Sequence, residues 1–267
     1  MMKAILNKLL NHVQFNRVHI IKTLLINFFY LPFNQAIKFP ILIRGKSKLV
    51  NPWKGKIIIN GPIKTGMIQI GNSDPVRSFF DRTFINIEGT LIISQGVVLR
   101  RGMKLFVRES ATLELKQNVV IGDNCTIICW DYIQFKEYMR CGNNTQFMDT
   151  DFHYVLNRTN NTIKDNHARI IIEANCWIGA WCVIKKGSHL PKGTIVAGPY
   201  SMISKDYTSL LPEFSMIAGS PAKLIASGYQ RIENVSNENM LKSYFSTTTT
   251  PYVLDESIDL TEFCTTK

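Results

Sequence analysis

The stretch IEANCWIGAWCVIKKGSHLPKGTIVAGPYSM, residues 172–202, repeats a pattern of six residues. An aliphatic residue occupies every sixth position, namely Ile172, Ile178, Ile184, Leu190, Val196 and Met202. Four positions after each of the first four stands a small residue: Cys176, Cys182, Ser188 and Thr194. Tyr200 breaks this second rule. A period of six matches neither an α-helix, with about 3.6 residues per turn, nor the alternation of a long β-strand.

A six-residue period is typical of a chain that runs straight for a few residues, turns by roughly 120° and repeats. Three such sides close a triangular coil of about eighteen residues. The aliphatic residue then fills the interior, and the small residue fits near the corner, where space is limited. The pattern therefore predicts an all-β parallel β-helix, in which Cys176 and Cys182 serve as small apolar fillers.

The same register continues upstream with less regularity. A hexad that begins at Ile121 and contains Cys125 leads to Ile127 and Ile133, and the phase then slips by two to Phe135, Cys141 and Phe147. Earlier still, 84–93 and 111–115 alternate apolar and polar residues between glycine turns. We expect these segments to form further coils, and we place the β-helix domain at 57–226.

Two segments leave the predicted coil. Residues 154–168 are polar, lack the period and follow Asp149-Thr-Asp-Phe-His153, so we expect an inserted loop with a function at the active site. Residues 227–267 are predicted to form a helical and irregular tail. Residues 1–56 are predicted to form a basic, amphipathic and partly helical N-terminal segment.

The positive charge lies in the first quarter of the chain. The net charge is +11, and residues 1–73 contain eleven Lys and Arg but no acidic residue, the first being Asp74. Basic residues of this segment are interleaved with Ile, Leu and Phe, as in 19–30, which favours contact of residues 1–45 with an anionic bilayer over nucleic acid. The alternative is an amphipathic helix that packs on the body of the protein.

The N-terminal segment does not resemble a signal peptide or a membrane-spanning helix. Its longest apolar run, 24–33, is interrupted by Asn27 and is followed by no small-residue cleavage site. We therefore expect a cytoplasmic protein that rests peripherally on the inner leaflet of the plasma membrane.

Several other chemistries lack their sequence requirements. The six cysteines include no C-x-x-C pair, and a zinc-dependent β-helix hydratase would need three histidines, whereas this chain has no close histidine pair. Neither a nucleophile elbow, a P-loop nor a dinucleotide fingerprint is present. We expect no metal cofactor.

Four stretches carry a resemblance to a known family: Met148-Asp-Thr-Asp-Phe-His153, Asn175-Cys-Trp-Ile-Gly-Ala180, Ser204-Lys-Asp206 and Ile217-Ala-Gly-Ser-Pro-Ala-Lys223. Together with the coil pattern, they resemble the hexapeptide-repeat, left-handed β-helix acyltransferases, which include galactoside, maltose and chloramphenicol acetyltransferases. Within that family the chain looks most like the branch that O-acetylates polysaccharides.

The resemblance implies a homotrimer with active sites between subunits and acetyl-CoA as the acyl donor. By position, His153 matches the family's catalytic base, and Ala180 the residue whose backbone faces the thioester. Residues that match positions along the cofactor are Gly198, Ser204, Lys205 and Lys223. Three departures stand out: 197–201 is one residue longer than usual, Ala226 replaces a common basic residue, and Lys136 replaces a turn glycine.

Acetyl transfer from a thioester to an alcohol requires alignment and removal of the hydroxyl proton. Histidine suits the second task because its ordinary pKa is about 6.5. In an extended strand, Asp149, Asp151 and His153 would project on one face. One carboxylate could then orient the imidazole while the other binds sugar hydroxyls. The alternative role for both carboxylates is the capping of turns.

The sequence thus predicts an O-acetyltransferase that acts on a sugar hydroxyl in capsule, lipopolysaccharide or exopolysaccharide biosynthesis. An N-acetyltransferase acting on an amino-sugar nucleotide is a second reading. A third is a non-catalytic β-helix scaffold.

Overall fold

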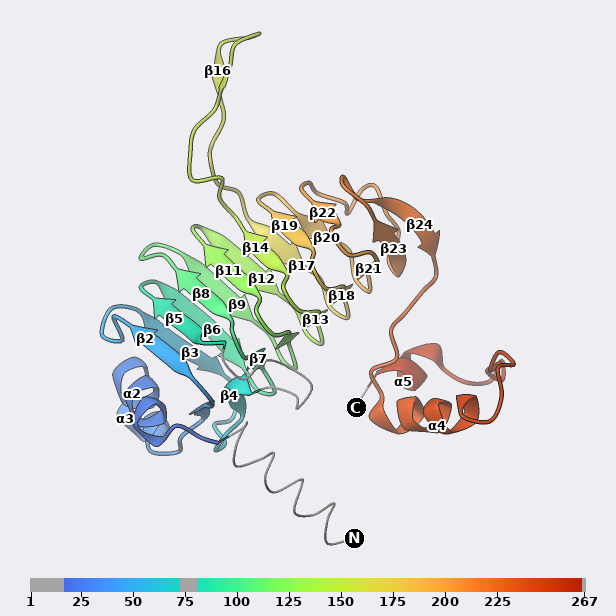
Figure 1. Cartoon of the computed structure of the whole chain (residues 1–267), viewed down its shortest axis with the longest axis horizontal. Helices are drawn as coiled ribbons and strands as arrows, with labels where there is room; N and C mark the ends of the chain where they lie inside the picture. Colours follow the sequence, from blue (N-terminus) through green and yellow to red (C-terminus); the bar gives the residue numbers. More distant parts are fainter. Residues whose placement is uncertain (1–16, 73–80, 266–267) are drawn as a thin grey trace, which may run out of the picture.

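The computed structural model describes residues 17–72 and 81–265, which wind into a three-sided parallel coil (Figure 1). The chain visits three sheets in a fixed order, and each circuit adds one strand to each sheet. This arrangement is that of a left-handed β-helix, so the predicted fold class is confirmed.

Within the described residues, the first sheet contains β1 (Ile41–Ile43), β4 (Ile68–Asn72), β7 (Val98–Arg100), β10 (Val120–Ile121), β13 (Arg140–Cys141), β18 (Trp177–Ile178), β21 (Ile195–Val196), β23 (Ser215–Ala218) and β24 (Lys223–Ser227). The second contains β2 (Ser47–Val50), β5 (Thr83–Ile87), β8 (Lys104–Val107), β11 (Thr126–Cys129), β14 (Gln146–Met148), β19 (Val183–Lys185) and β22 (Met202–Ile203). The third contains β3 (Lys56–Asn60), β6 (Thr90–Ser94), β9 (Thr112–Leu115), β12 (Tyr132–Phe135), β17 (Ile170–Ile172) and β20 (His189–Leu190).

The strands pair in parallel along each sheet, except for the antiparallel pair β23–β24 at the end of the first. In the most regular coil Trp177 pairs with Ile195, 18 residues later. We call the edge between the first and second sheets the first corner, and the edge between the second and third sheets the second corner.

The interior is a continuous column of aliphatic side chains. The predicted interior residues Ile172, Ile178, Ile184, Leu190 and Val196 are all buried, as are the small residues Cys176, Cys182, Ser188 and Thr194. The upstream register through Ile121, Ile127, Ile133, Phe135, Cys141 and Phe147 is also buried. At about 25 cal/mol per Å² of apolar surface, this column is the main source of stability.

The prediction for Met202 is wrong by one position. Ile203 pairs with Ile184 and is fully buried, while Met202 lies partly exposed. Ser201 is buried one position after 200, where the small residue is expected, and Tyr200 is 72% exposed. The additional residue in 197–201 therefore adds length to the turn and shifts the register that follows it.

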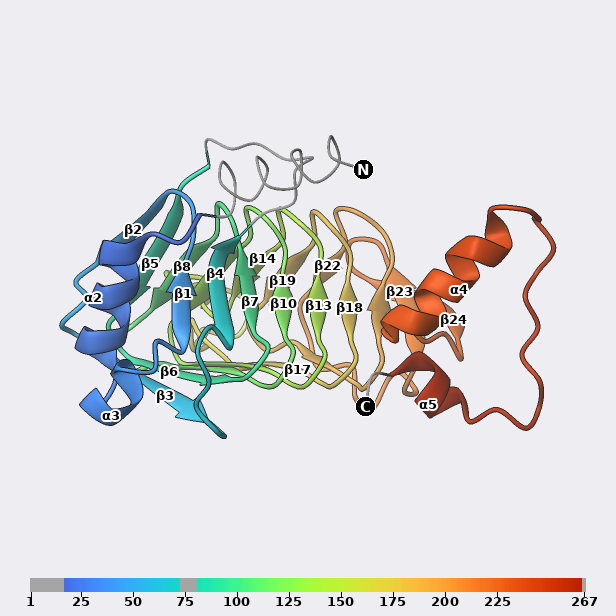
Figure 2. The ribbon, with the colours of Figure 1, turned by 90° about the horizontal axis from the view of Figure 1, so that it is seen from below.

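Helix α2 (Ile20–Tyr30) covers the open end of the coil, followed by the short α3 (Phe33–Ala36) (Figure 2). The amide of Asn27 bonds both the carbonyl and the N–H of Ile41, and Thr23 accepts a hydrogen bond from the Ile43 N–H. Because β1 and β2 already belong to sheets, the coil begins at Ile41, before the predicted boundary at 57. The part of the predicted N-terminal segment in residues 1–16 lies outside the described residues.

The inserted loop is an antiparallel hairpin formed by β15 (Leu156–Asn157) and β16 (Thr162–Ile163). It extends away from the coil as an arm (Figure 1). After β24 the tail forms α4 (Val235–Phe245) and α5 (Leu260–Cys264). No helix in the described part of the chain is both long enough and apolar enough to cross a bilayer.

Candidate active site

The segment that carries Asp149, Asp151 and His153 turns sharply at the second corner. Strand β14 ends at Met148, and Phe152 has a φ of 63°. The prediction of one extended strand with the three side chains on one face is therefore wrong. The three residues face three different environments.

Asp149 is fully buried and caps a turn. Its Oδ1 accepts a hydrogen bond from the Trp130 N–H at 2.6 Å, and its Oδ2 accepts those of Asp131 and Tyr132 at 2.8 and 3.0 Å. Burial raises the pKa of the Asp149 carboxyl, while the three amides oppose that rise. Because these amides belong to the preceding coil, Asp149 joins two coils and contacts neither His153 nor open solvent. Of the two predicted roles, the capping of a turn fits this geometry.

Asp151 forms ion pairs with two consecutive lysines, Lys185 at 3.1 Å and Lys186 at 3.0 Å. Burial acts to raise the pKa of the Asp151 carboxyl, but both lysines outweigh it and lower that pKa. Lys186 also donates to the backbone carbonyl of Asp165, on the returning strand of the arm, at 2.7 Å. The Asp151–Lys186–Asp165 contacts therefore fasten the base of the arm to the coil.

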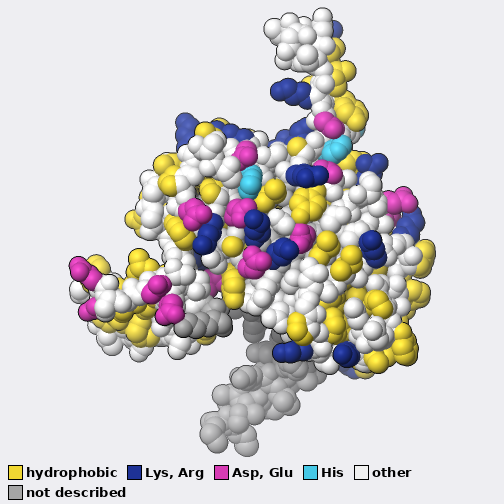
Figure 3. Space-filling view, turned by 180° about the vertical axis from the view of Figure 1, so that it is seen from behind, with side chains coloured by type: hydrophobic (Ala, Val, Ile, Leu, Met, Phe, Trp, Pro, Cys, Tyr) yellow, Lys and Arg dark blue, Asp and Glu magenta, His cyan; other side chains and the backbone are white. Residues whose placement is uncertain are grey.

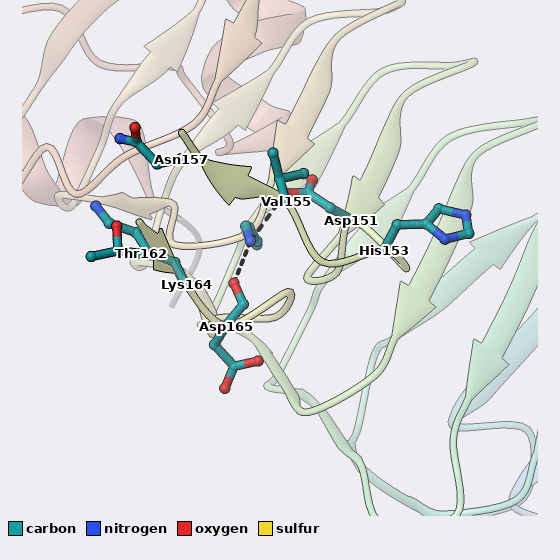
Figure 4. Close-up of a pocket in the computed structure, with 8 residues that line it drawn as sticks. Asp151, His153, Val155, Asn157, Thr162, Lys164 and Asp165 are labelled. Atoms are coloured by element: carbon teal, nitrogen blue, oxygen red, sulfur yellow. Dashed lines mark hydrogen bonds and ion pairs between the residues drawn. The ribbon is translucent and has the colours of Figure 1, made fainter. Parts of the chain in front are cut away.

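His153 stands at the base of the arm and is exposed. It borders a hollow of about 450 Å³, whose other lining residues include Asp151, Val155, Lys164 and Asp165. Figure 4 shows the imidazole of His153 pointing away from Asp151 and from the rest of the hollow. Across 17–72 and 81–265, the only hydrogen bond recorded for His153 joins its backbone N–H to the Asp151 carbonyl at 2.7 Å. The imidazole is therefore turned toward solvent, on the outer side of the second corner.

Aromatic side chains surround the base of the arm. The rings of Phe152 and Trp130 meet edge to face with centroids 5.5 Å apart, and Trp130 lies 6.5 Å from Phe106 on the neighbouring strand β8. The Arg108 guanidinium lies 4.5 Å from the centroid of the Trp130 ring. This row of rings runs along the second corner beside His153.

Three of the predicted cofactor residues stack at the first corner. Ala180 follows β18, Gly198 follows β21 one coil later, and Lys223 pairs with Ala218 at the end of β23. Gly198 is closely packed, because a Cβ at this position would lie 3.1 Å from that of Ala218. The rings of Trp181 and Tyr200, 51% and 72% exposed, lie 6.2 Å apart at this corner.

This corner fits the parts of coenzyme A. Exposed rings suit the adenine base, and the exposed ammonium of Lys223 suits the phosphates. The small side chains of Ala180 and Gly198 leave the backbone accessible to a narrow pantetheine chain.

The other two predicted cofactor residues lie elsewhere. Ser204 and Lys205 follow β22 at the end of the second sheet, and so lie at the second corner with His153. Both are exposed, and the Lys205 ammonium lies 5.3 Å from the centroid of the Tyr207 ring. The predicted catalytic and cofactor residues are thus divided between the first and second corners. The width of the second sheet separates Ala180 from His153.

Sequence reasoning missed Lys185 and Lys186, which contact Asp151, and the exposed pair Trp181 and Tyr200. The hexad pattern held a signal for the lysine pair. Lys185 follows the interior residue Ile184 and pairs across the sheet with Met148, next to Asp149. Among the described residues, no group of three or more His, Cys, Asp or Glu side chains could hold a metal ion.

No protein-family model matches this sequence, and no curated protein matches it. Solved structures do resemble it in fold. NeuO, a polySia-specific acetyltransferase, is 17% identical over 78% of this chain and 94% of its own, with a TM-score of 0.43. OatWY, a polysialic acid O-acetyltransferase, is 16% identical over 74% and 98%, with a TM-score of 0.45.

VCA0836 from Vibrio cholerae, a hexapeptide-repeat acetyltransferase determined with acetyl coenzyme A, is 20% identical over 47% of this chain and 64% of its own, with a TM-score of 0.38. All three structures are at most 20% identical to this chain, and its membership of the acyltransferase family stays a prediction.

Proposed function

We propose that this chain is an acetyl-CoA-dependent O-acetyltransferase that acts on a sugar hydroxyl in surface polysaccharide biosynthesis. The observation that carries the proposal is the position of His153. Its imidazole is exposed at a corner of the coil, at the base of a projecting arm and away from the ion pairs of Asp151. A base in this position is accessible to a large acceptor such as a glycan.

In this proposal, the chain's contribution is alignment and proton transfer. A bound acetyl-CoA supplies an acyl group that its thioester has already activated. A ring nitrogen of His153 removes the proton of the acceptor hydroxyl as the oxygen attacks the acyl carbon, and later returns that proton to the departing sulfur. Asp151, held by Lys185 and Lys186, acts as a positioning residue that fixes the turn before His153.

The division of the site between two corners supports a homotrimer. Within one chain, the second sheet separates His153 from Ala180, Gly198 and Lys223. In a symmetric trimer the second corner of one subunit can face the first corner of its neighbour, which brings the imidazole to the cofactor groove. We therefore propose that each active site uses residues of two subunits.

The experiment measures acetyl transfer from acetyl-CoA to a panel of sugars, sugar nucleotides and oligosaccharides. The readout is the free thiol of the released coenzyme A. We expect His153→Ala to lower turnover at least about 100-fold while acetyl-CoA still raises the melting temperature. His167→Ala is the matched control. His167 lies where the arm rejoins the coil, and its imidazole pairs with the Asp165 carboxylate at 2.9 Å.

The outcomes separate the readings. Turnover that survives His153→Ala and is lost in His167→Ala would move the base to His167. Transfer to amino-sugar nucleotides alone would favour N-acetylation. Absence of both transfer and a thermal shift with acetyl-CoA would favour a scaffold.

A further inference from the structure

Helix α2 buries a mixed face and exposes an apolar one. Thr23 and Asn27 are buried together with Ile26 and Tyr30, whereas Ile21, Phe28 and Phe29 are 66%, 42% and 53% exposed. A helix on the surface of a globular protein normally shows the opposite arrangement. Thr23 and Asn27 bond the edge of the first coil, and the outward face consists largely of apolar side chains.

The outward apolar surface continues beyond α2. The Phe28 ring lies 6.1 Å from that of Phe33, which is 73% exposed, and Ile37 is 49% exposed. We call the following residues the apolar face: Ile21, Leu24, Phe28, Phe29, Phe33 and Ile37. In Figure 3, hydrophobic side chains gather with basic ones at the lower right, the end that α2 and α3 cover. Contiguous exposed apolar surface of this kind marks an interaction site.

A basic hollow of about 600 Å³ adjoins the apolar face. Its lining includes four cations, Lys22, Lys46, Lys48 and Arg82, and its described lining residues include no acidic side chain. Ser47 also lines the hollow and is only 4% exposed, yet its hydroxyl has no hydrogen-bond partner among the described residues. Four cations that line one hollow suit a ligand with phosphate oxygens.

We propose that this end of the coil binds an anionic phospholipid bilayer. The apolar face enters the interfacial region, and the basic hollow receives a lipid phosphate. The combination selects this partner by its chemistry. Nucleic acid would leave Phe28 and Phe33 in water, and a second copy of the chain would bring two cationic ends together.

The proposal fixes the orientation of the molecule. Because α2 lies across the end of the coil, the coil axis points away from the bilayer (Figure 2). In a trimer whose axis runs along the coils, all three apolar faces would meet the same membrane. His153 and the arm would then stand several coils above the lipid surface, where a lipid-linked glycan could reach them.

The test is sedimentation of the full chain with phosphatidylcholine vesicles, with and without phosphatidylglycerol. We expect binding to the anionic vesicles, weakened by salt. Lys48→Gln should lower the partition coefficient by roughly fivefold, as expected for one charge near an anionic surface. Its matched control, Lys104→Gln, removes an exposed cation from the middle of the coil and should leave binding unchanged.

The apolar face is tested by the double variant Ile21→Ser with Phe28→Ser, which should lower binding at least about tenfold. Val253→Ser is the control, since Val253 is 84% exposed at the opposite end of the molecule. An unchanged melting temperature in every variant shows that the coil remains folded. These vesicle assays measure binding and need no catalysis, so their outcome does not depend on the acetyltransferase proposal.

Three results would overturn the proposal. One is equal binding to neutral and anionic vesicles. Another is a change of oligomeric state in the Ile21 and Phe28 double variant, which would assign the apolar face to contact between copies. The third is a pair of results: removal of residues 1–16 abolishes binding, and the double variant binds as well as the wild type. That pair would place the contact outside α2.

Discussion

The Oδ1 atom of Asp149 lies 2.6 Å from the backbone nitrogen of Trp130, in the preceding coil. The same carboxylate accepts two more backbone N–H groups, so its loss leaves three buried donors without a partner. We predict that Asp149→Ala lowers the free energy of unfolding by about 3 kcal/mol. Urea denaturation measures this change, and His153→Ala, an exposed substitution, should show almost none. A stable Asp149→Ala protein without turnover would contradict this assignment and favour a catalytic role.

The arm should loosen in acid. The pKa of Asp151 in the folded chain lies below its ordinary value of 3.8, because the pairs with Lys186 and Lys185 outweigh the effect of burial. The stabilisation is therefore present above pH 3.8 and is lost as the pH falls through the lower, folded-state pKa. We predict lower hydrogen-exchange protection factors for 154–165 in that acidic range, each calculated against the intrinsic rate at the same pH.

Asp151→Asn provides the control for the acid effect. Its arm should have lower protection factors than the wild-type arm even at neutral pH. Equal exchange in the two proteins at pH 7 would show that these ion pairs do not hold the arm.

A shared active site predicts recovery of activity in mixed oligomers. His153→Ala and Ala180→Trp should each abolish transfer, the first by removal of the base and the second by obstruction of the cofactor groove. Co-expressed in equal amounts, the two variants should restore about one quarter of the wild-type activity. Half of the subunits carry an intact second corner and half an intact first corner, so random mixing brings two intact corners together at about one site in four. No recovery, despite confirmed mixed oligomers, would place the whole site within one chain.

The cysteines should be inert in the folded protein. All six are unpaired and buried, and burial raises the pKa of Cys176 to about 12. A thiol reagent at pH 8 should therefore label almost none before unfolding and all six afterwards, because the thiolate is the reactive form. Rapid labelling under native conditions would show local opening, of the coil for the five cysteines that precede Cys264 and of the tail for Cys264.

The sequence was sufficient for the coil because its repeat is local. Each interior position from Ile172 to Val196 could be identified from spacing alone, and each is buried. The error at Met202 came from the same source, since a period counts residues and cannot show that a turn takes up one more. Tyr200, which broke the small-residue rule, was the signal for that longer turn.

The geometry of the site could not be read from spacing in the same way. Alternation placed Asp149, Asp151 and His153 on one face, but alternation holds only within a strand, and this strand ends at Met148. The role of Asp149 depends on amides nearly twenty residues earlier, which no local pattern connects to it. The contact of Asp151 with Lys185 and Lys186 arises because the arm leaves and rejoins the coil at one corner.

The two ends of the first sheet also constrain how such a chain can change in length. Asn27 bonds the exposed edge of β1, and β24 closes the far edge by reversing direction. Asn27 thus occupies the backbone groups of Ile41 at one edge, and the antiparallel β24 ends the parallel stacking at the other. Insertions and deletions over evolution should therefore be tolerated as complete turns within the solenoid, and selected against at its termini.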